Sequence, residues 1–461
     1  MSVITQLLII IATLFVLILL GCPVFACLGC TSAIAVWLFF PKDLTVQFAT
    51  IAYQQGTSIN QLIPPMFILM AEFLAKGGVA DDIFRALNYL LGKIRGGLAM
   101  ATTLACTIFA ALCGSSPATA AAMGKISIGS MTKRKYQKGF AVGTVAGAGT
   151  LGILIPPSLT LVGYGILTET SIVKLLMAGL VPGILVSLMM IASIAIRARI
   201  SPHLVGVITP EFINSKKYKP DQYAMSADEL LAPSKEDEQL HADKKERYRL
   251  FVSVIPALVL IIVVLGSMYT GICTASESAA LGALGAFLIV AFGRRLNKRD
   301  FLDTLRSAAR NSTMIIFLTV AGLSLSFVLS FLKIPSTLTT MLVEANVNKW
   351  VLIAGLYVMW LVLGCLMDPG SMTMLTIPFL FDSVIALGFD PIWLGIVSVI
   401  ATEIGMISPP VGLNLFVLKA NTDIEMKHIM TGCLPYIGVL LLALVLFTVF
   451  PGIVTFVPSR M

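Results

Sequence analysis

The sequence predicts an all-α protein that crosses a membrane many times and is built from two inverted repeats. Three observations support this prediction: an apolar composition, a series of apolar runs of membrane-spanning length, and helix-breaking motifs that recur in matched positions. The 461-residue chain is 57% hydrophobic and only 12% charged, whereas soluble globular proteins carry about 25% charged residues. The net charge of +8 therefore belongs to loops beside a lipid bilayer and does not indicate a nucleic-acid partner.

The first repeat is expected to cover residues 1–197. A helix needs roughly 20 apolar residues to span a bilayer, and the apolar runs of this half predict the following elements: spans at 4–20, 24–40, 60–76 and 172–197, a re-entrant helical hairpin at about 97–130, and a broken helix at 137–168. The hairpin follows from the basic stretches "KIR" and "KRKYQK" that flank it. Because both mark the same side of the membrane, the chain must enter and return.

The second repeat is expected to cover residues 250–461, after a polar connector at 198–249. Its apolar runs predict the following elements: spans at 250–268, 276–292, 311–332 and 430–456, a re-entrant hairpin at about 350–387, and a broken helix at 392–419. Lys and Arg gather on the cytoplasmic side of membrane proteins. This rule places the connector in the cytoplasm and both termini in the periplasm. The charged stretch "KKERYRLF" at the end of the connector is expected to form an interfacial helix.

The two halves share the order of their helix breaks. Gly405 follows Gly152 by 253 residues, and Pro409 follows Pro156 by the same offset. Each Pro-Pro pair is preceded, about 40 residues earlier, by a further break, "LCGSSPATAAAMG" in the first half and "LGCLMDPGSMTML" in the second. Irregular backbone is tolerated in a membrane only where it is buried in protein or lines a cavity, and paired broken helices are typical of transporters. Four breaks in matched pairs argue against simple packing kinks.

The residues at these breaks predict helix starts. Ser116, Asp368 and Ser408 each precede a proline, and a Ser or Asp cap followed by Pro at the first helical position is a helix-start signature. Free N–H groups at such starts suit an anion, while the unpaired carbonyl and hydroxyl oxygens around each break suit Na⁺. The breaks therefore predict two similar ion sites with a substrate between them.

Four carboxylates fall in apolar stretches, where an ionisable group is costly and usually functional. Asp368 is both a candidate site residue and a candidate helix cap. Glu403 lies beside the carbonyl groups of the broken helix and is a candidate for a residue that positions these ligands without binding the ion itself. Glu72 and Asp382 are expected to face polar neighbours between helices.

Four motifs resemble the large membrane subunit of tripartite ATP-independent periplasmic (TRAP) transporters. They occur in order as "GSSPATAAAMG", "GTLGILIPPS", "GICTASESAALGA" and "EIGMISPPVGLNLF", and the resemblance extends over nearly the whole chain except the connector. It implies an elevator-type ion transporter fold, in which a domain carrying both hairpins slides against a fixed scaffold. It also implies sodium-coupled uptake of a small organic anion, such as a carboxylate or sulfonate, across the bacterial inner membrane.

The resemblance further implies partners and site residues. The partners are a small four-helix TRAP membrane subunit and a periplasmic substrate-binding protein; Na⁺ is the coupling ion and there is no other cofactor. The implied sodium-binding residues form two sets: a first site with Ser115, Ser116, Gly149, Gly152 and Pro157, and a second site with Gly364, Gly405 and Ser408 and with Thr402 nearby. The implied substrate-binding residues are Ser116, Pro117, Asp368, Ser371 and Asn414. Many family members have Ser where this chain has Cys113 and Thr where it has Ser408; a thiol at a sodium position would be a poor ligand.

Three other classes of protein are alternatives. A self-sufficient ion-coupled carboxylate permease of a related inverted-repeat fold would share the hairpins and breaks, and differs only in needing no binding protein. A membrane enzyme would need a titrating group or a metal motif near its site, but no His lies within a span and neither H-E-x-x-H nor a P-loop occurs. A channel is disfavoured because capped, broken helices suit an occluded site better than a continuous pore.

Overall fold

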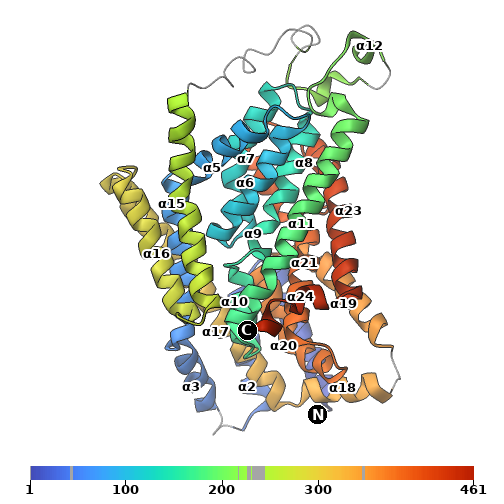
Figure 1. Cartoon of the computed structure of the whole chain (residues 1–461). Helices are drawn as coiled ribbons and strands as arrows, with labels where there is room; N and C mark the ends of the chain where they lie inside the picture. The colour runs from blue at the N-terminus through green and yellow to red at the C-terminus, as the bar shows by residue number, and fades with distance from the viewer. Residues whose placement is uncertain (1, 42–44, 216–217, 226–229, 231–243, 345–347) are drawn as a thin grey trace.

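The computed structural model describes residues 2–41, 45–215, 218–225, 230, 244–344 and 348–461. Long helices run between the two ends of the molecule (Figure 1). Helix α12 (Pro210–Ile213) lies at one end, and both chain termini lie toward the other. The helices have the following bounds: α1 (Val3–Leu19), α2 (Val24–Phe39), α3 (Thr45–Gly56), α4 (Ile63–Lys76), α5 (Val79–Leu91), α6 (Gly97–Cys113), α7 (Ser116–Lys133), α8 (Lys138–Gly149), α9 (Leu151–Leu154), α10 (Leu159–Leu167), α11 (Ile172–Ile200), α12 (Pro210–Ile213), α15 (Lys244–Tyr269), α16 (Ala275–Phe292), α17 (Lys298–Phe331), α18 (Ile334–Glu344), α19 (Lys349–Gly364), α20 (Pro369–Ala386), α21 (Pro391–Met406), α22 (Leu413–Asn421), α23 (Met426–Val449) and α24 (Gly452–Thr455).

Helices break at the four places where Pro and Gly cluster in the sequence. Breaks separate α6 from α7, α8 and α9 from α10, α19 from α20, and α21 from α22. At the two Pro-Pro breaks, proline prevents the helix from continuing because it lacks an N–H and its ring clashes with the preceding turn; at the two hairpin breaks, Pro117 and Pro369 lie in the first turn of the following helix. In Figure 1, α6 and α7 lie toward the end that carries α12, and α19 and α20 toward the opposite end.

Three helices of more than ten residues were not expected from apolar runs, namely α3, α5 and α18. Helix α5 is amphipathic: Val79, Ile83 and Phe84 are buried, while its first turn carries Asp81 and Asp82. A helix of 13 residues with one apolar face is stabilised by packing on its neighbours, so a search for runs of about 20 apolar residues misses it.

Several predicted boundaries were wrong. The span expected at 311–332 begins 13 residues earlier, because α17 is a 34-residue helix from Lys298 to Phe331. The side chain of Asn297 caps its N-terminus by accepting a hydrogen bond from the backbone N–H of Asp300. The final span ends at Val449, before Pro451. The stretch "KKERYRLF" forms no separate interfacial helix, because it is the start of α15.

The two halves of the chain interleave. Helices α2 and α4 from the first half pack against α16 and α17 from the second, and α8 packs against α23. At the α8–α23 crossing, a Cβ on Gly143 would lie 2.0 Å from the carbonyl oxygen of Gly432. Glycine is therefore required on α8 at this point, because the two backbones touch.

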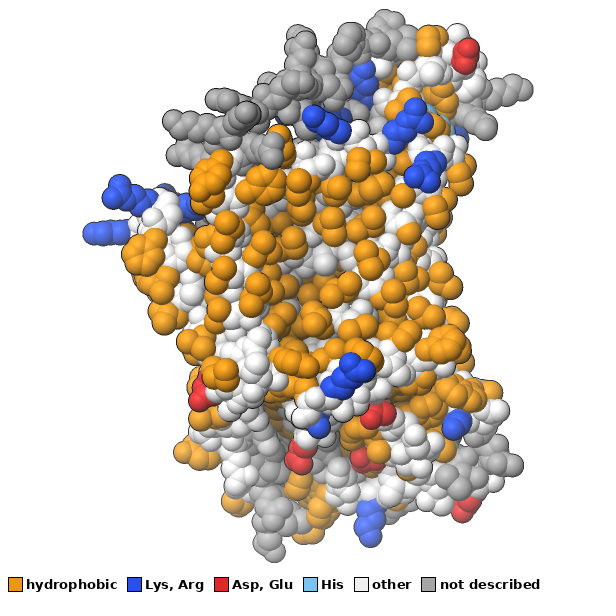
Figure 2. Space-filling view, in the orientation of Figure 1, with side chains coloured by type: hydrophobic (Ala, Val, Ile, Leu, Met, Phe, Trp, Pro, Cys, Tyr) orange, Lys and Arg blue, Asp and Glu red, His pale blue; other side chains and the backbone are white. Residues whose placement is uncertain are grey.

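The described helices form a multi-pass membrane protein. Seven described helical segments are long and apolar enough to cross a membrane, with the broken run Lys138–Thr168 counted as one. The number is eight if the bent segment Ile59–Lys76 plus Val79–Leu91 is one span, and five shorter apolar helices accompany them. A broad hydrophobic band covers the middle of the surface in Figure 2, with Lys and Arg prominent at the upper end and both charge signs at the lower end.

Candidate functional site

The first hairpin turns at Gly114 and Ser115. Gly114 ends α6 with a φ of +67°, a left-handed conformation that favours glycine. A Cβ at this residue would lie 2.4 Å from the carbonyl oxygen of Pro157. The backbone N–H of Leu159 donates to the carbonyl oxygen of Gly114 across 3.3 Å, so the hairpin tip is joined to the first broken helix.

Two glycines of the first broken helix, Gly149 and Gly152, lie against the first hairpin. A Cβ on Gly152 would lie 2.6 Å from the carbonyl oxygen of Ser115, and one on Gly149 would lie 3.0 Å from Cβ of Ala120. The structure thus brings together the five residues predicted for the first sodium site, which are Ser115, Ser116, Gly149, Gly152 and Pro157. Close backbone approach leaves no room for side chains there, so the backbone of the hairpin tip lies directly against the backbone of the broken helix.

The second hairpin and broken helix meet in a similar way. A Cβ on Gly364 would lie 2.8 Å from the carbonyl oxygen of Thr402, and one on Gly405 would lie 2.7 Å from Cα of Gly364. The backbone N–H of Gly412 donates to the carbonyl oxygen of Cys365 across 3.1 Å. Each hairpin tip therefore accepts one backbone hydrogen bond from the broken helix of its own half.

Two predicted helix caps were wrong and one was confirmed. Helix α7 begins at Ser116, one residue early, and its N-cap Ser115 makes no capping bond through its side chain. Ser408 starts no helix: its hydroxyl donates to Ile404 across 2.6 Å, and α22 begins after Gly412. Asp368 caps α20, because its Oδ2 accepts from the backbone N–H of Ser371 at 2.9 Å.

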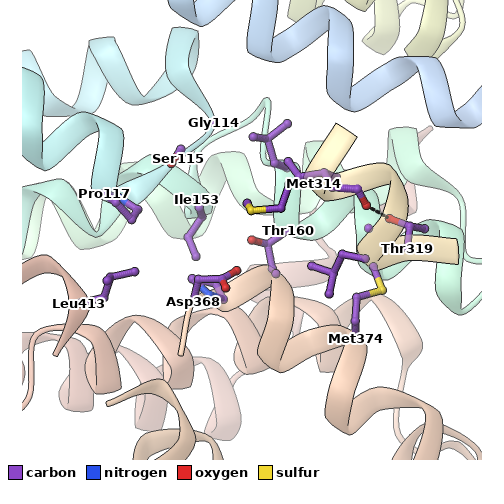
Figure 3. Close-up of a pocket in the computed structure, with 16 residues that line it drawn as sticks. Gly114, Ser115, Pro117, Ile153, Thr160, Met314, Thr319, Asp368, Met374 and Leu413 are labelled. Carbon is purple, nitrogen blue, oxygen red and sulfur yellow. Dashed lines mark hydrogen bonds between the residues drawn. The ribbon is translucent and has the colours of Figure 1, made fainter. Parts of the chain in front are cut away.

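A cavity of about 300 Å³ lies between the two hairpin tips. Residues from both halves line it: Gly114, Ser115, Pro117, Ile153, Leu159, Thr160, Gly163, Met314, Ile315, Leu318, Thr319, Asp368, Pro369, Gly370, Met374 and Leu413. In Figure 3, Ser115 and Pro117 lie on one side of this cavity and Asp368 and Leu413 on another. No Lys, Arg or His belongs to this set of described residues.

A second cavity, of about 490 Å³, adjoins the first. The two share the lining residues Ser115, Pro117, Leu159, Met314 and Ile315. Glu72 and Asn311 line only the second cavity, where the Asn311 amide and the Ser307 hydroxyl donate to Glu72 at 3.2 and 2.6 Å. The prediction that Glu72 contacts polar neighbours between helices is thus confirmed. The same prediction for Asp382 was wrong, because this residue is exposed on α20.

The remaining predicted residues lie near the central cavity without lining it. The Ser371 hydroxyl donates to Oδ1 of Asp368 at 2.5 Å. Asn414 is fully buried, and its amide nitrogen donates to the Ser116 hydroxyl at 2.8 Å. Cys113 is buried at the end of α6 and lines the second cavity.

Sequence reasoning missed several lining residues, notably Thr160, Thr319 and Met374. The first two face the cavity from helices α10 and α17 (Figure 3). Met374 lies between two glycines of other helices, because a Cβ on Gly163 or Gly322 would come within 2.7 or 3.0 Å of its side chain. No local motif marks these residues, since only the packing of α10, α17 and α20 brings them together.

Helices interrupted around a shared cavity, within a multi-pass bundle, define a helical membrane transporter. The fold is similar to that of the Alcanivorax borkumensis YdaH transporter, with a TM-score of 0.56 over 89% of this chain and 88% of that chain, at 12% identity. A family model described as "Tripartite ATP-independent periplasmic transporter, DctM component" matches residues 11–453. The chain belongs to this family of TRAP transporter large permease subunits, and it is a permease and not an enzyme.

Curated relatives agree with this assignment. The chain is 34% identical to the C4-dicarboxylate TRAP transporter large permease protein DctM of Vibrio cholerae, over 97% of both proteins. It is 31% identical to the isethionate TRAP transporter permease protein DctMQ of Oleidesulfovibrio alaskensis, over 88% of this chain and 59% of that protein. It is 28% identical to the ectoine TRAP transporter large permease protein TeaC of Halomonas elongata, over 97% of this chain and 98% of that protein.

Proposed function

We propose that this permease takes up a small organic anion, such as a carboxylate or sulfonate, across the bacterial inner membrane in symport with Na⁺. The observation that carries the proposal is the pair of helix breaks, one from each half of the chain, that meet at one central cavity. Transporters built from discontinuous helices bind substrate and coupling ions at such breaks, near the middle of the membrane.

The sodium sites are proposed at the two sets of interrupted backbone. Gly114 and Cys365, at the hairpin tips, each accept one backbone hydrogen bond from the neighbouring broken helix. Around them, helix ends leave further carbonyl oxygens without an intrahelical donor. The proposed ligands are the residues of the two predicted sodium sets. Ser408 contributes through its backbone or its oxygen lone pairs, because its hydroxyl hydrogen is used on Ile404.

The central cavity is the proposed substrate site. Its described lining offers an anion no basic side chain, so the negative charge must be met by other groups. The N-terminal turns of α7 and α20 supply partial positive charge, and the backbone N–H groups of Ser116 and Gly370 are the donors there, because Pro117 and Pro369 have none. Bound Na⁺ would add the remaining positive charge, which is a physical reason for coupling the two fluxes.

The proposed architecture consists of two inverted repeats, at residues 1–197 and 250–461, joined by a cytoplasmic connector at 198–249. The equivalent backbone bonds Leu159–Gly114 and Gly412–Cys365 support the repeat, and so does the placement of the two hairpins toward opposite ends in Figure 1. Lys and Arg at the connector end support a cytoplasmic connector and periplasmic termini (Figure 2). Elevator movement is proposed for the group that carries both hairpins.

Two partners are proposed: a small four-helix membrane subunit and a periplasmic substrate-binding protein. The name of the isethionate relative, DctMQ, and this chain's coverage of only 59% of it support a second component in that protein. The exposed apolar side chains of α15, including Ile255, Val259 and Ile262, are compatible with either lipid or such a subunit.

The proposal is tested by purifying the chain gently from native membranes together with whatever accompanies it. The ligand released from a co-purifying binding protein is identified by mass spectrometry as the transported substrate. Uptake of that substrate is then measured in proteoliposomes. We expect uptake to require both an inward Na⁺ gradient and the binding protein. Equal uptake with choline in place of Na⁺ would reject sodium coupling, and full uptake without the binding protein would identify a self-sufficient permease.

A further inference from the structure

A buried carboxylate joins the two halves of the chain beside the helix breaks. Glu403, on α21, is 1% exposed, and its Oε2 accepts a hydrogen bond from the Ser116 hydroxyl at 3.0 Å. The same Ser116 oxygen accepts from the amide nitrogen of Asn414 at 2.8 Å. Ser116 and Asn414 are both fully buried. Three segments therefore meet at one polar cluster: the start of α7, the last turns of α21 and the start of α22.

Two oxygens of this cluster have no donor. Within the part of the chain that the structure describes, Glu403 Oε1 and Asn414 Oδ1 are buried and accept no hydrogen bond. Both are acceptors that flank the same Ser116 hydroxyl. Buried polar atoms are almost always partnered, and an unpartnered one costs free energy. What is missing from the cluster is a positive or donating group.

The charge of Glu403 distinguishes between the species that could fill this place. No ion pair involving Glu403 occurs among the described residues. A water molecule would satisfy hydrogen bonds but would leave the carboxylate charge buried without compensation, which is far more costly. Two species remain: a proton on Glu403, which removes the charge and makes Oε1 a donor, and a monovalent cation, which contacts both acceptor oxygens while the carboxylate stays ionised. Carboxylate and amide oxygens are hard ligands, which suit Na⁺.

The cluster lies between the two proposed sodium sets. Ser116 belongs to the first set, and Thr402 and Gly405 of the second set flank Glu403 in the sequence. We infer that Glu403 Oε1 and Asn414 Oδ1 bind a sodium ion between the two helix breaks. This inference rests on the proposed sodium coupling and deepens it, because it adds side-chain ligands and a compensating negative charge to sites otherwise formed by neutral oxygens.

The test measures sodium binding without transport. The full-length chain, with any subunit that co-purifies, is unfolded thermally during a NaCl titration at constant ionic strength, with choline chloride as the balancing salt. A ligand that binds only the folded state stabilises it by RT ln(1 + [L]/Kd), so the NaCl dependence of the unfolding temperature gives the apparent affinity. Glu403→Gln keeps the size of the side chain and removes the charge, Asn414→Ala removes the second oxygen, and Asp382→Asn is the matched control at an exposed carboxylate.

We expect Glu403→Gln to weaken the apparent affinity for Na⁺ by about tenfold to a hundredfold, the range for losing a charge-assisted contact. Asn414→Ala should weaken it less, and Asp382→Asn should match the wild type. Unfolding in choline chloride and elution from a sizing column establish that each variant is folded; direct ²²Na⁺ binding gives a second readout in which Glu403→Gln retains fewer sodium ions per chain.

Two opposite results can be told apart. If the wild type is stabilised by Na⁺ and Glu403→Gln responds identically, the Glu403 site is wrong while sodium coupling survives. If the wild type itself shows no response specific to Na⁺, the proposed sodium coupling fails together with the site.

Discussion

The contact between Gly152 and the first hairpin tip gives a sharp test of the site geometry. In Gly152→Ala the new Cβ would lie 2.6 Å from the Ser115 carbonyl oxygen and 2.8 Å from Cα of Ser116. Ordinary van der Waals contact begins at 3.4 Å, so the tip must move by roughly 0.8 Å. The obstructing atoms are backbone, which cannot rotate away as a side chain can. Overpacking of this kind costs about 1–3 kcal/mol.

The matched control is Gly129→Ala on α7, where a Cβ meets nothing within 4 Å. Alanine in a helix interior is favoured over glycine by about 0.5–1 kcal/mol, so this variant should unfold at or above the wild-type temperature. Gly152→Ala should unfold at a lower temperature and lose part of its stabilisation by NaCl, because the oxygens of the first sodium set are displaced. Both quantities come from one thermal titration of purified protein.

The reasoning would be refuted if Gly152→Ala unfolded like Gly129→Ala and kept the wild-type response to NaCl. Such a result would mean that the tip of the first hairpin does not rest on α9. It would also remove the geometric support for grouping the first five predicted sodium residues.

Three further predictions concern the same region. Ser115→Ala should leave the unfolding temperature nearly unchanged, because the Ser115 side chain makes no capping bond, yet it should weaken sodium dependence of uptake; wild-type sodium dependence would remove Ser115 from the site. Asp368→Ala should cost about 0.5–2 kcal/mol of stability through loss of the cap on Ser371, and should reduce uptake while membrane insertion stays intact, as judged by membrane fractionation. Gly163→Ala meets only the tip of the Met374 side chain, at 2.7 Å, so it should fold normally but narrow the central cavity; an unchanged KM for the cargo in proteoliposomes would contradict this.

Sequence reasoning located the helix breaks because their causes are local. Pro156, Pro157, Pro409 and Pro410 lack the N–H that a continuing helix needs, and this is true whatever surrounds them. The matched spacing of the breaks can also be counted directly along the sequence. The cap at Asp368 was predictable for the same reason, since its partner Ser371 is three residues away.

The same local rules failed where distant groups decided the outcome. Ser408 precedes a proline and resembles a helix cap, but its hydroxyl donates a hydrogen bond to the carbonyl oxygen of Ile404. Helix α22 starts only after Gly412, whose backbone N–H donates to the carbonyl oxygen of Cys365. Helices α5 and α18 were missed because packing and not length stabilises them.

By itself, therefore, the sequence determined that this is a multi-pass helical transporter subunit, where its helices break, and which family it belongs to. Only the tertiary structure decided that Glu403 meets Ser116, 287 positions away, and that Met374 fits between Gly163 and Gly322. The physical reason is the range of the interactions involved. Propensity and proline geometry act over a few residues, whereas a binding cavity is made by side chains that become neighbours only when the helices of both halves pack together.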